Sequence, residues 1–132
     1  MADREIISEW LQKAEDDFQF ARISLDEKKP FVAQICFLFQ QSAEKYLKAF
    51  MLSQGLKLQK IHDLMILLKR CLVKAPRMAE LSDDCNMLST FYVETRYPVH
   101  WPATFAHEDA EQAFRAAHRI RSFIRSELNL TG

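Results

Sequence analysis

The chain has 132 residues, of which 48% are hydrophobic, and its 18 Lys and Arg residues balance its 18 Asp and Glu residues. This length and composition predict a single domain over residues 1–132, with a packed core that needs no disulfide framework. The net charge of zero excludes a general polyanion binder, so any contact with nucleic acid would require a local patch.

Apolar residues recur at helical spacing from the N-terminus onward. The first predicted helix covers Asp3–Lys28, with Asp3 as its N-cap. The second begins with Pro30 in its first turn and runs to about Gln54, with Gly55 as its C-cap residue. Its apolar arc is wide, which suggests burial against more than one neighbour and favours a dimer.

Three further helices are predicted, at His62–Val73, at Arg77–Arg96, and from a start within Ala103–Glu108 to Leu128. Pro98 disfavours helix at Tyr97, so we expect an ordered loop over Tyr97–Ala106. Strand patterns are absent from the sequence. The predicted fold is therefore all-α, an up-and-down four-helix bundle with an additional short helix, five helices in total.

The N-terminal segment is charged, and no apolar run is longer than five residues, the length of Ile35–Phe39. We therefore expect no signal peptide, no membrane association and a cytoplasmic location. The three cysteines, Cys36, Cys71 and Cys85, lie among apolar residues. They are predicted to be buried reduced thiols.

The chain has only two glycines, Gly55 and Gly132. Glycine-rich phosphate loops of the P-loop or dinucleotide type are thereby excluded. No Glu-x-x-His pair occurs, which argues against a carboxylate-bridged metal bundle. The cysteines and histidines also lack zinc-ligand spacing. Neither a metal nor a cofactor is expected.

The predicted second helix carries a strip of polar residues. One set, Gln41, Lys45 and Lys48, shares a face, as does the overlapping set of Gln40, Glu44 and Lys48. The strip could hold a phosphate or a partner loop. It could equally be a solvated face with a Glu44–Lys48 pair, and spacing alone favours this second interpretation.

Polar residues also mark the start of the predicted third helix. Asp63 there complements the helix dipole. His62 could donate to a phosphate or simply bond a nearby loop, and the structural role is the more common one.

Arg96 and His100 follow the predicted fourth helix. A guanidinium that stabilises phosphate charge and an imidazole that moves a proton suit RNA cleavage without a metal. Alternatively, Arg96 caps helix carbonyls and His100 is an incidental loop residue.

The final helix carries a basic row that is either an RNA footprint or a solvated face: Arg115, His118, Arg119, Arg121 and Arg125.

Several segments together resemble one known family, the HEPN domains (higher eukaryotes and prokaryotes nucleotide-binding), of the nucleotidyltransferase-associated type. The resemblance covers nearly the whole chain and rests on the segments WLQKAEDDFQFA, FLFQQSAEKYLKAFMLSQG, KIHDLMILL and ETRYP. It implies a helical bundle that forms a homodimer through its long helices. It also implies a minimal nucleotidyltransferase partner in a toxin–antitoxin-like pair.

Nuclease-active HEPN proteins carry an Arg followed, after roughly four to six residues, by a His. Arg96 matches the Arg, whereas His100 follows after only three residues, with Tyr97 and Pro98 in the gap. The resemblance therefore implies a catalytically weak or inactive protein that binds a nucleotide or RNA. One alternative is an active metal-independent endoribonuclease that uses Arg96 and His100. A second is a purely structural helical interaction module. The nucleotide- or RNA-binding residues expected are Gln41, Lys45, Lys48, His62, Arg96 and Tyr97.

Overall fold

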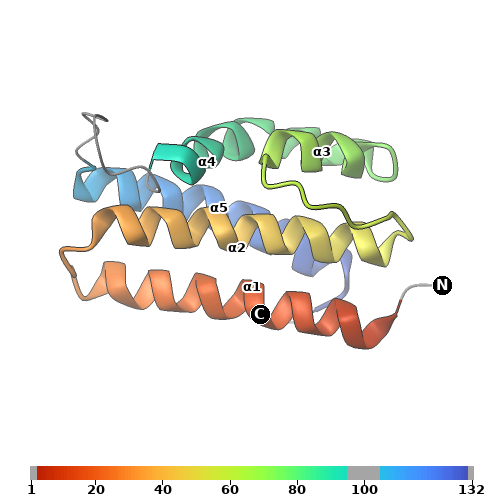
Figure 1. Cartoon of the computed structure of the whole chain (residues 1–132), viewed down its shortest axis with the longest axis horizontal. Helices are drawn as coiled ribbons and strands as arrows, with labels where there is room; N and C mark the ends of the chain where they lie inside the picture. Colours follow the sequence, from red (N-terminus) through yellow and green to blue (C-terminus); the bar gives the residue numbers. More distant parts are fainter. Residues whose placement is uncertain (1–2, 95–104, 131–132) are drawn as a thin grey trace.

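The computed structural model of the chain describes residues 3–94 and 105–130, and these residues are all-α, with no strand among them (Figure 1). The prediction of an all-α fold with five α-helices is confirmed. In chain order the elements are α1 (Arg4–Asp26), α2 (Val32–Ser53), α3 (Leu64–Leu72), the 3-10 helix η1 (Pro76–Leu81), α4 (Ser82–Glu94) and α5 (His107–Glu127).

The second helix, α2, is the centre of the bundle. It packs against α1 on one side and against α3 and α4 on the other, and α5 covers it from behind (Figure 1). Its buried residues fill nearly every position from Phe39 to Met51. The wide apolar arc of α2 is therefore explained by neighbours within one chain, and it gives no argument for a dimer.

Local signals in the sequence account for most helix ends. Asp3 accepts a hydrogen bond of 2.9 Å from the backbone N–H of Glu5, which confirms it as the N-cap of α1. After α1, Lys28 has a φ of 55°, which ends the helix in a left-handed turn. Gly55 has a φ of 73° and follows the actual C-cap of α2, Gln54. A glycine adopts this conformation at little cost because it has no Cβ.

Two predicted helix starts are wrong. The second helix begins at Val32 rather than with Pro30 in its first turn, and its N-cap, Phe31, makes no side-chain capping bond. The third begins at Leu64, because the carboxylate of Asp63 accepts from the N–H groups of Met65 and Ile66 and makes Asp63 the N-cap.

The predicted fourth helix is two elements. Its first five residues, 77–81, belong to η1, which begins one residue earlier at Pro76, and α4 begins only after it. The backbone N–H of Met78 donates to the carbonyl of Ala75, three residues earlier, as expected for this tighter helix. The predicted end at Arg96 and most of the predicted loop lie outside the described residues.

The core contains a cluster of three phenylalanines from α1, α2 and α5. The ring of Phe39 lies 5.7 Å from that of Phe18 and 5.8 Å from that of Phe114, both in edge-on contacts. The hydroxyl of Ser42 donates a hydrogen bond of 2.8 Å to the carbonyl of Ala14, which joins α2 to α1 inside the bundle.

The cysteines are confirmed as buried free thiols, and burial raises the pKa of each to about 12: Cys36, Cys71 and Cys85.

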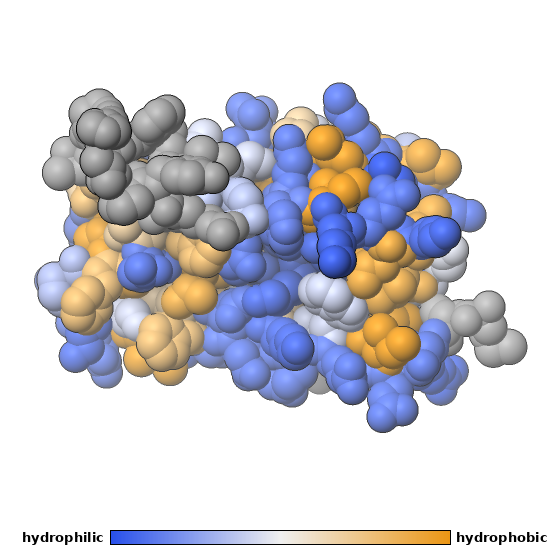
Figure 2. Space-filling view, viewed as in Figure 1, coloured by the Kyte–Doolittle hydropathy of each residue, from blue (hydrophilic) through white to orange (hydrophobic). Residues whose placement is uncertain are grey.

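The outer surface shown in Figure 2 is polar over the middle of the α1–α2 face, with hydrophobic side chains gathered toward both ends of the molecule. Three large apolar side chains near the α1–α2 turn are strongly exposed, namely Phe20, Ile23 and Phe31. Phe20 and Phe31 line an apolar groove of about 360 Å³.

Candidate functional site

Three polar residues of α2 are buried at successive helical turns. Gln40, Glu44 and Lys48 lie at spacings of four residues and are at most 4% exposed. The interpretation of this strip as a solvated face is therefore wrong, although the Glu44–Lys48 pair that it included is present at 2.9 Å. Buried charges of this kind require partners, because a charged side chain that loses its hydration without gaining hydrogen bonds or an opposite charge destabilises the fold. The partners are other residues of α2 together with His62, which lies in the segment that precedes α3.

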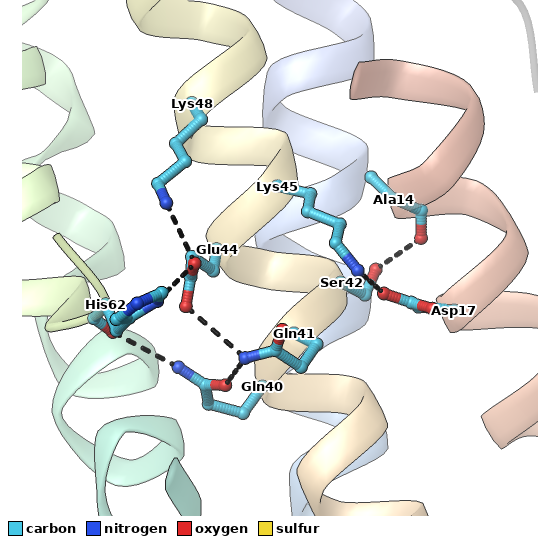
Figure 3. A network of polar contacts seen from close by, with 9 residues as sticks. All are labelled: Ala14, Asp17, Gln40, Gln41, Ser42, Glu44, Lys45, Lys48 and His62. Atoms are coloured by element: carbon cyan, nitrogen blue, oxygen red, sulfur yellow. Dashed lines mark hydrogen bonds and ion pairs between the residues drawn. The ribbon is translucent and has the colours of Figure 1, made fainter. Parts of the chain in front are cut away.

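Glu44 is the centre of this network (Figure 3). One carboxylate oxygen accepts from the ammonium of Lys48 and contacts Nδ1 of His62, each at 2.9 Å. The other accepts from the amide of Gln41 at 3.4 Å. An ionised carboxylate can only accept, so Nδ1 of His62 must carry the hydrogen. Nε2 of His62 is then left to accept a hydrogen bond when the ring is neutral, and to donate one when it is protonated.

His62 is held at several points, yet its side chain remains 49% exposed. Besides the contact with Glu44, its backbone carbonyl accepts a hydrogen bond of 3.3 Å from Gln40. Its ring stacks on that of Tyr92, with centroids 4.9 Å apart and planes 12° from parallel. Tyr92 in turn lies beside Phe37. The structure therefore places an oriented, half-open imidazole at the junction of α2, α4 and the segment before α3.

The two predicted lysines of α2 already have partners. Lys45 is paired with Asp17 of α1, and Figure 3 shows it pointing away from Glu44. Lys48 is buried against Glu44, and its ammonium lies 5.5 Å from the centre of the Trp10 ring. Of the predicted binding residues, Gln41, Lys48 and His62 are brought together on the carboxylate of Glu44. Arg96, Tyr97 and His100 lie outside the described residues.

The basic row on α5 is divided among internal contacts rather than forming one free surface. Arg119 makes a bidentate pair with Asp84. Arg121 makes another with Glu15 at 2.7 Å for both contacts. Arg125, the last residue of the row, reaches the hydroxyl of Tyr46 at 3.5 Å. Much of the predicted positive charge is thus compensated locally, which weakens the case for an RNA footprint along α5.

Two groups important to these networks were absent from the predicted site. Glu44 is the centre of the cluster. It lies four residues before Lys48 and four after Gln40, and this spacing is the sequence signal that could have identified it. Tyr92 lies within the predicted fourth helix and was not among the candidate site residues. Nothing in its local sequence indicates that it meets His62, since the contact joins residues from separate elements.

The architecture defines the class of protein: an all-α bundle in which a central second helix buries a charged network beneath an exposed histidine. The sequence matches the model of the HEPN domain over residues 7–127. The chain belongs to the HEPN domain family.

Two solved structures resemble the chain over most of its length. A protein from Thermus thermophilus is 28% identical, with a TM-score of 0.75, and the match covers 91% of this chain and 96% of that one. An archaeal HEPN homologue is 25% identical, with a TM-score of 0.72, covering 92% of this chain and 96% of that one. No match was found among curated proteins. Among the described residues, no helix is long and apolar enough to cross a membrane.

Proposed function

We propose that this HEPN protein binds the phosphate of a nucleotide or RNA at His62, acts as a homodimer beside a minimal nucleotidyltransferase, and has little or no catalytic activity of its own. The observation that carries the binding proposal is the contact of 2.9 Å between the carboxylate of Glu44 and Nδ1 of His62. The buried carboxylate of Glu44 holds the imidazole of His62 at Nδ1. About half of the His62 side chain nevertheless remains exposed to solvent. Orienting a histidine in advance lowers the entropic cost of binding a ligand.

The charges around His62 favour an anion. Glu44 and Lys48 neutralise one another, so a protonated His62 adds one positive charge to the cluster. The preceding segment adds two exposed lysines, Lys57 and Lys60. Within the part of the chain that the structure describes, neither lysine takes part in an ion pair or hydrogen bond. Two free ammonium groups close in sequence to an oriented imidazole suit phosphate recognition.

Binding is tested with the full-length chain. We expect fluorescently labelled single-stranded RNA to bind with an affinity that falls as salt is raised, because phosphate contacts release counterions. His62→Ala should weaken binding by about tenfold, the loss of one charge-assisted hydrogen bond. The matched control is His118→Ala, since His118 is also exposed and touches aromatic rings but lies on α5. Equal affinity of the two variants would contradict the proposal.

The same samples test catalysis. Incubation of RNA with the protein in EDTA should leave the RNA intact. Cleavage that disappears in both Arg96→Ala and His100→Ala would instead establish the metal-independent endoribonuclease that the sequence offered as an alternative.

The partnership is tested separately. The exposed side chains of Phe20 and Phe31 support the homodimer, because large exposed apolar groups often mark protein contacts. Light scattering should give twice the 15.5 kDa mass of one chain. Purification from the native source should recover a nucleotidyltransferase with the dimer. A monomer that copurifies with no nucleotidyltransferase, and whose melting temperature no phosphate compound shifts, would leave only a helical interaction module.

A further inference from the structure

The stacked rings of His62 and Tyr92 form a flat aromatic surface that is open on one side. We infer that this surface, the His62–Tyr92 platform, stacks an unpaired nucleobase, so that the ligand is a nucleotide or single-stranded RNA rather than a duplex or a bare phosphate. The inference rests on the proposed function, because it assigns a second part of the ligand to the same site.

The geometry leaves one face of the imidazole for the ligand. Tyr92 covers the opposite face, with the two planes only 12° from parallel. Glu44 covers the Nδ1 edge. Since about half of the side chain remains exposed, the open area is the outer face together with the Nε2 edge. A planar base laid on that face would extend the existing stack by one ring.

The platform is rigid before any ligand arrives. Glu44 and Gln40 hold His62 from α2 through its ring and its backbone carbonyl. The ring of Phe37 lies 6.1 Å from that of Tyr92 and supports it. A stacking surface that is already ordered loses little conformational freedom on binding.

A polar group beside the platform can recognise the edge of a base. Gln41 donates its amide hydrogens to Gln40 at 2.7 Å and to Glu44 at 3.4 Å. Because Glu44 can only accept, the amide nitrogen of Gln41 is the atom that faces it. The amide oxygen of Gln41 accepts no hydrogen bond from a described residue. It therefore remains available to an amino group of the base.

The first experiment separates the base from the phosphate. Binding of AMP and of ribose 5-phosphate is compared by calorimetry with the full-length chain. Loss of the base should weaken binding by about 5- to 150-fold, the range for stacking one base on an aromatic side chain. A strand containing 2-aminopurine should lose fluorescence on binding, and a blunt duplex should bind more weakly than its single strand.

Three variants assign the effect to the platform. Tyr92→Phe keeps the ring and should keep both the affinity for AMP and the fluorescence loss. Tyr92→Leu removes the ring and should lose most of the preference for AMP over ribose 5-phosphate. Phe123→Leu is the matched control, since it removes a partly buried ring on α5, where Phe123 lies beside Arg77 rather than at the platform. Melting temperatures verify that each variant is folded.

The outcomes distinguish the two proposals. If ribose 5-phosphate binds as tightly as AMP, or if Tyr92→Leu keeps the preference for AMP, the platform is refuted while phosphate binding at His62 stands. If neither compound nor RNA binds, the proposed function fails and the platform fails with it.

Discussion

Arg121 on α5 donates two hydrogen bonds of 2.7 Å to the two carboxylate oxygens of Glu15 on α1, a residue 106 positions earlier in the chain. The same carboxylate accepts a hydrogen bond of 2.5 Å from the hydroxyl of Tyr46 on α2. The guanidinium of Arg121 also lies 5.0 Å from the centre of the Phe18 ring. One carboxylate therefore joins α1, α2 and α5 at the side of the core.

Glu15→Gln should destabilise the protein, because it leaves Arg121 largely buried without its counter-charge. We expect the free energy of unfolding to fall by about 1–3 kcal/mol, as for hydrogen bonds to charged groups. Urea denaturation gives this difference. The control is Asp26→Asn, which removes a carboxylate from the exposed Arg22–Asp26 pair and should change stability by less than about 0.5 kcal/mol. If Glu15→Gln lowered the free energy of unfolding as little as Asp26→Asn does, the Glu15 network would add nothing to stability.

The contribution of Glu15 should also depend on pH. Burial alone would raise the pKa of Glu15, but hydrogen bonds from Arg121, Tyr46 and Gln19 outweigh it and lower the pKa from 4.5 to about 2. A carboxylate whose pKa is lower in the folded state stabilises that state above the unfolded pKa, and the stabilisation is lost as the pH falls toward the folded pKa. The stability difference between the unmodified chain and Glu15→Gln should therefore stay constant from pH 7 to about pH 5. It should then shrink between pH 4.5 and pH 2. A difference that grows on acidification would contradict this assignment.

The buried pair of Glu44 and Lys48 should show strong coupling. Glu44→Gln leaves a buried ammonium without a counter-charge, and we expect a loss of about 3 kcal/mol in the free energy of unfolding. Adding Lys48→Met removes that uncompensated charge, so the double variant should be more stable than the sum of the two single losses predicts. A double-mutant cycle by urea denaturation measures the coupling, expected to exceed about 1 kcal/mol. Additive losses would mean that the two side chains act independently.

The phenylalanine cluster should contribute strongly to stability. Phe39 is fully buried against Phe18 and Phe114, so Phe39→Ala should cost about 3–5 kcal/mol and Phe39→Leu less than about 1.5 kcal/mol. Phe31→Ala is the control, because Phe31 is 63% exposed near the start of the same helix. Chemical denaturation ranks the three variants. A loss at Phe31 as large as that at Phe39 would be inconsistent with the packing described.

Most of the site was less predictable than the fold. The sequence placed Gln40, Glu44 and Lys48 on one face of a helix, but it did not show whether that face meets water or protein. His62 was singled out, whereas its contacts with Glu44 and Tyr92 were not foreseen. The pairing of Glu15 with Arg121 had no local signal, because residues so far apart meet only when α1 and α5 pack together.

What the sequence determined by itself was the set of helices and the family. Helical periodicity, the N-cap at Asp3 and the left-handed position at Gly55 are short-range effects, and each acts within a few residues of its own signal. Only the tertiary structure decided that the polar strip of α2 is buried and that it orients His62. The physical reason is that burial and charge pairing depend on which segments pack together. Here, the segment before α3 folds back over the central helix and turns a surface-like pattern into an interior network.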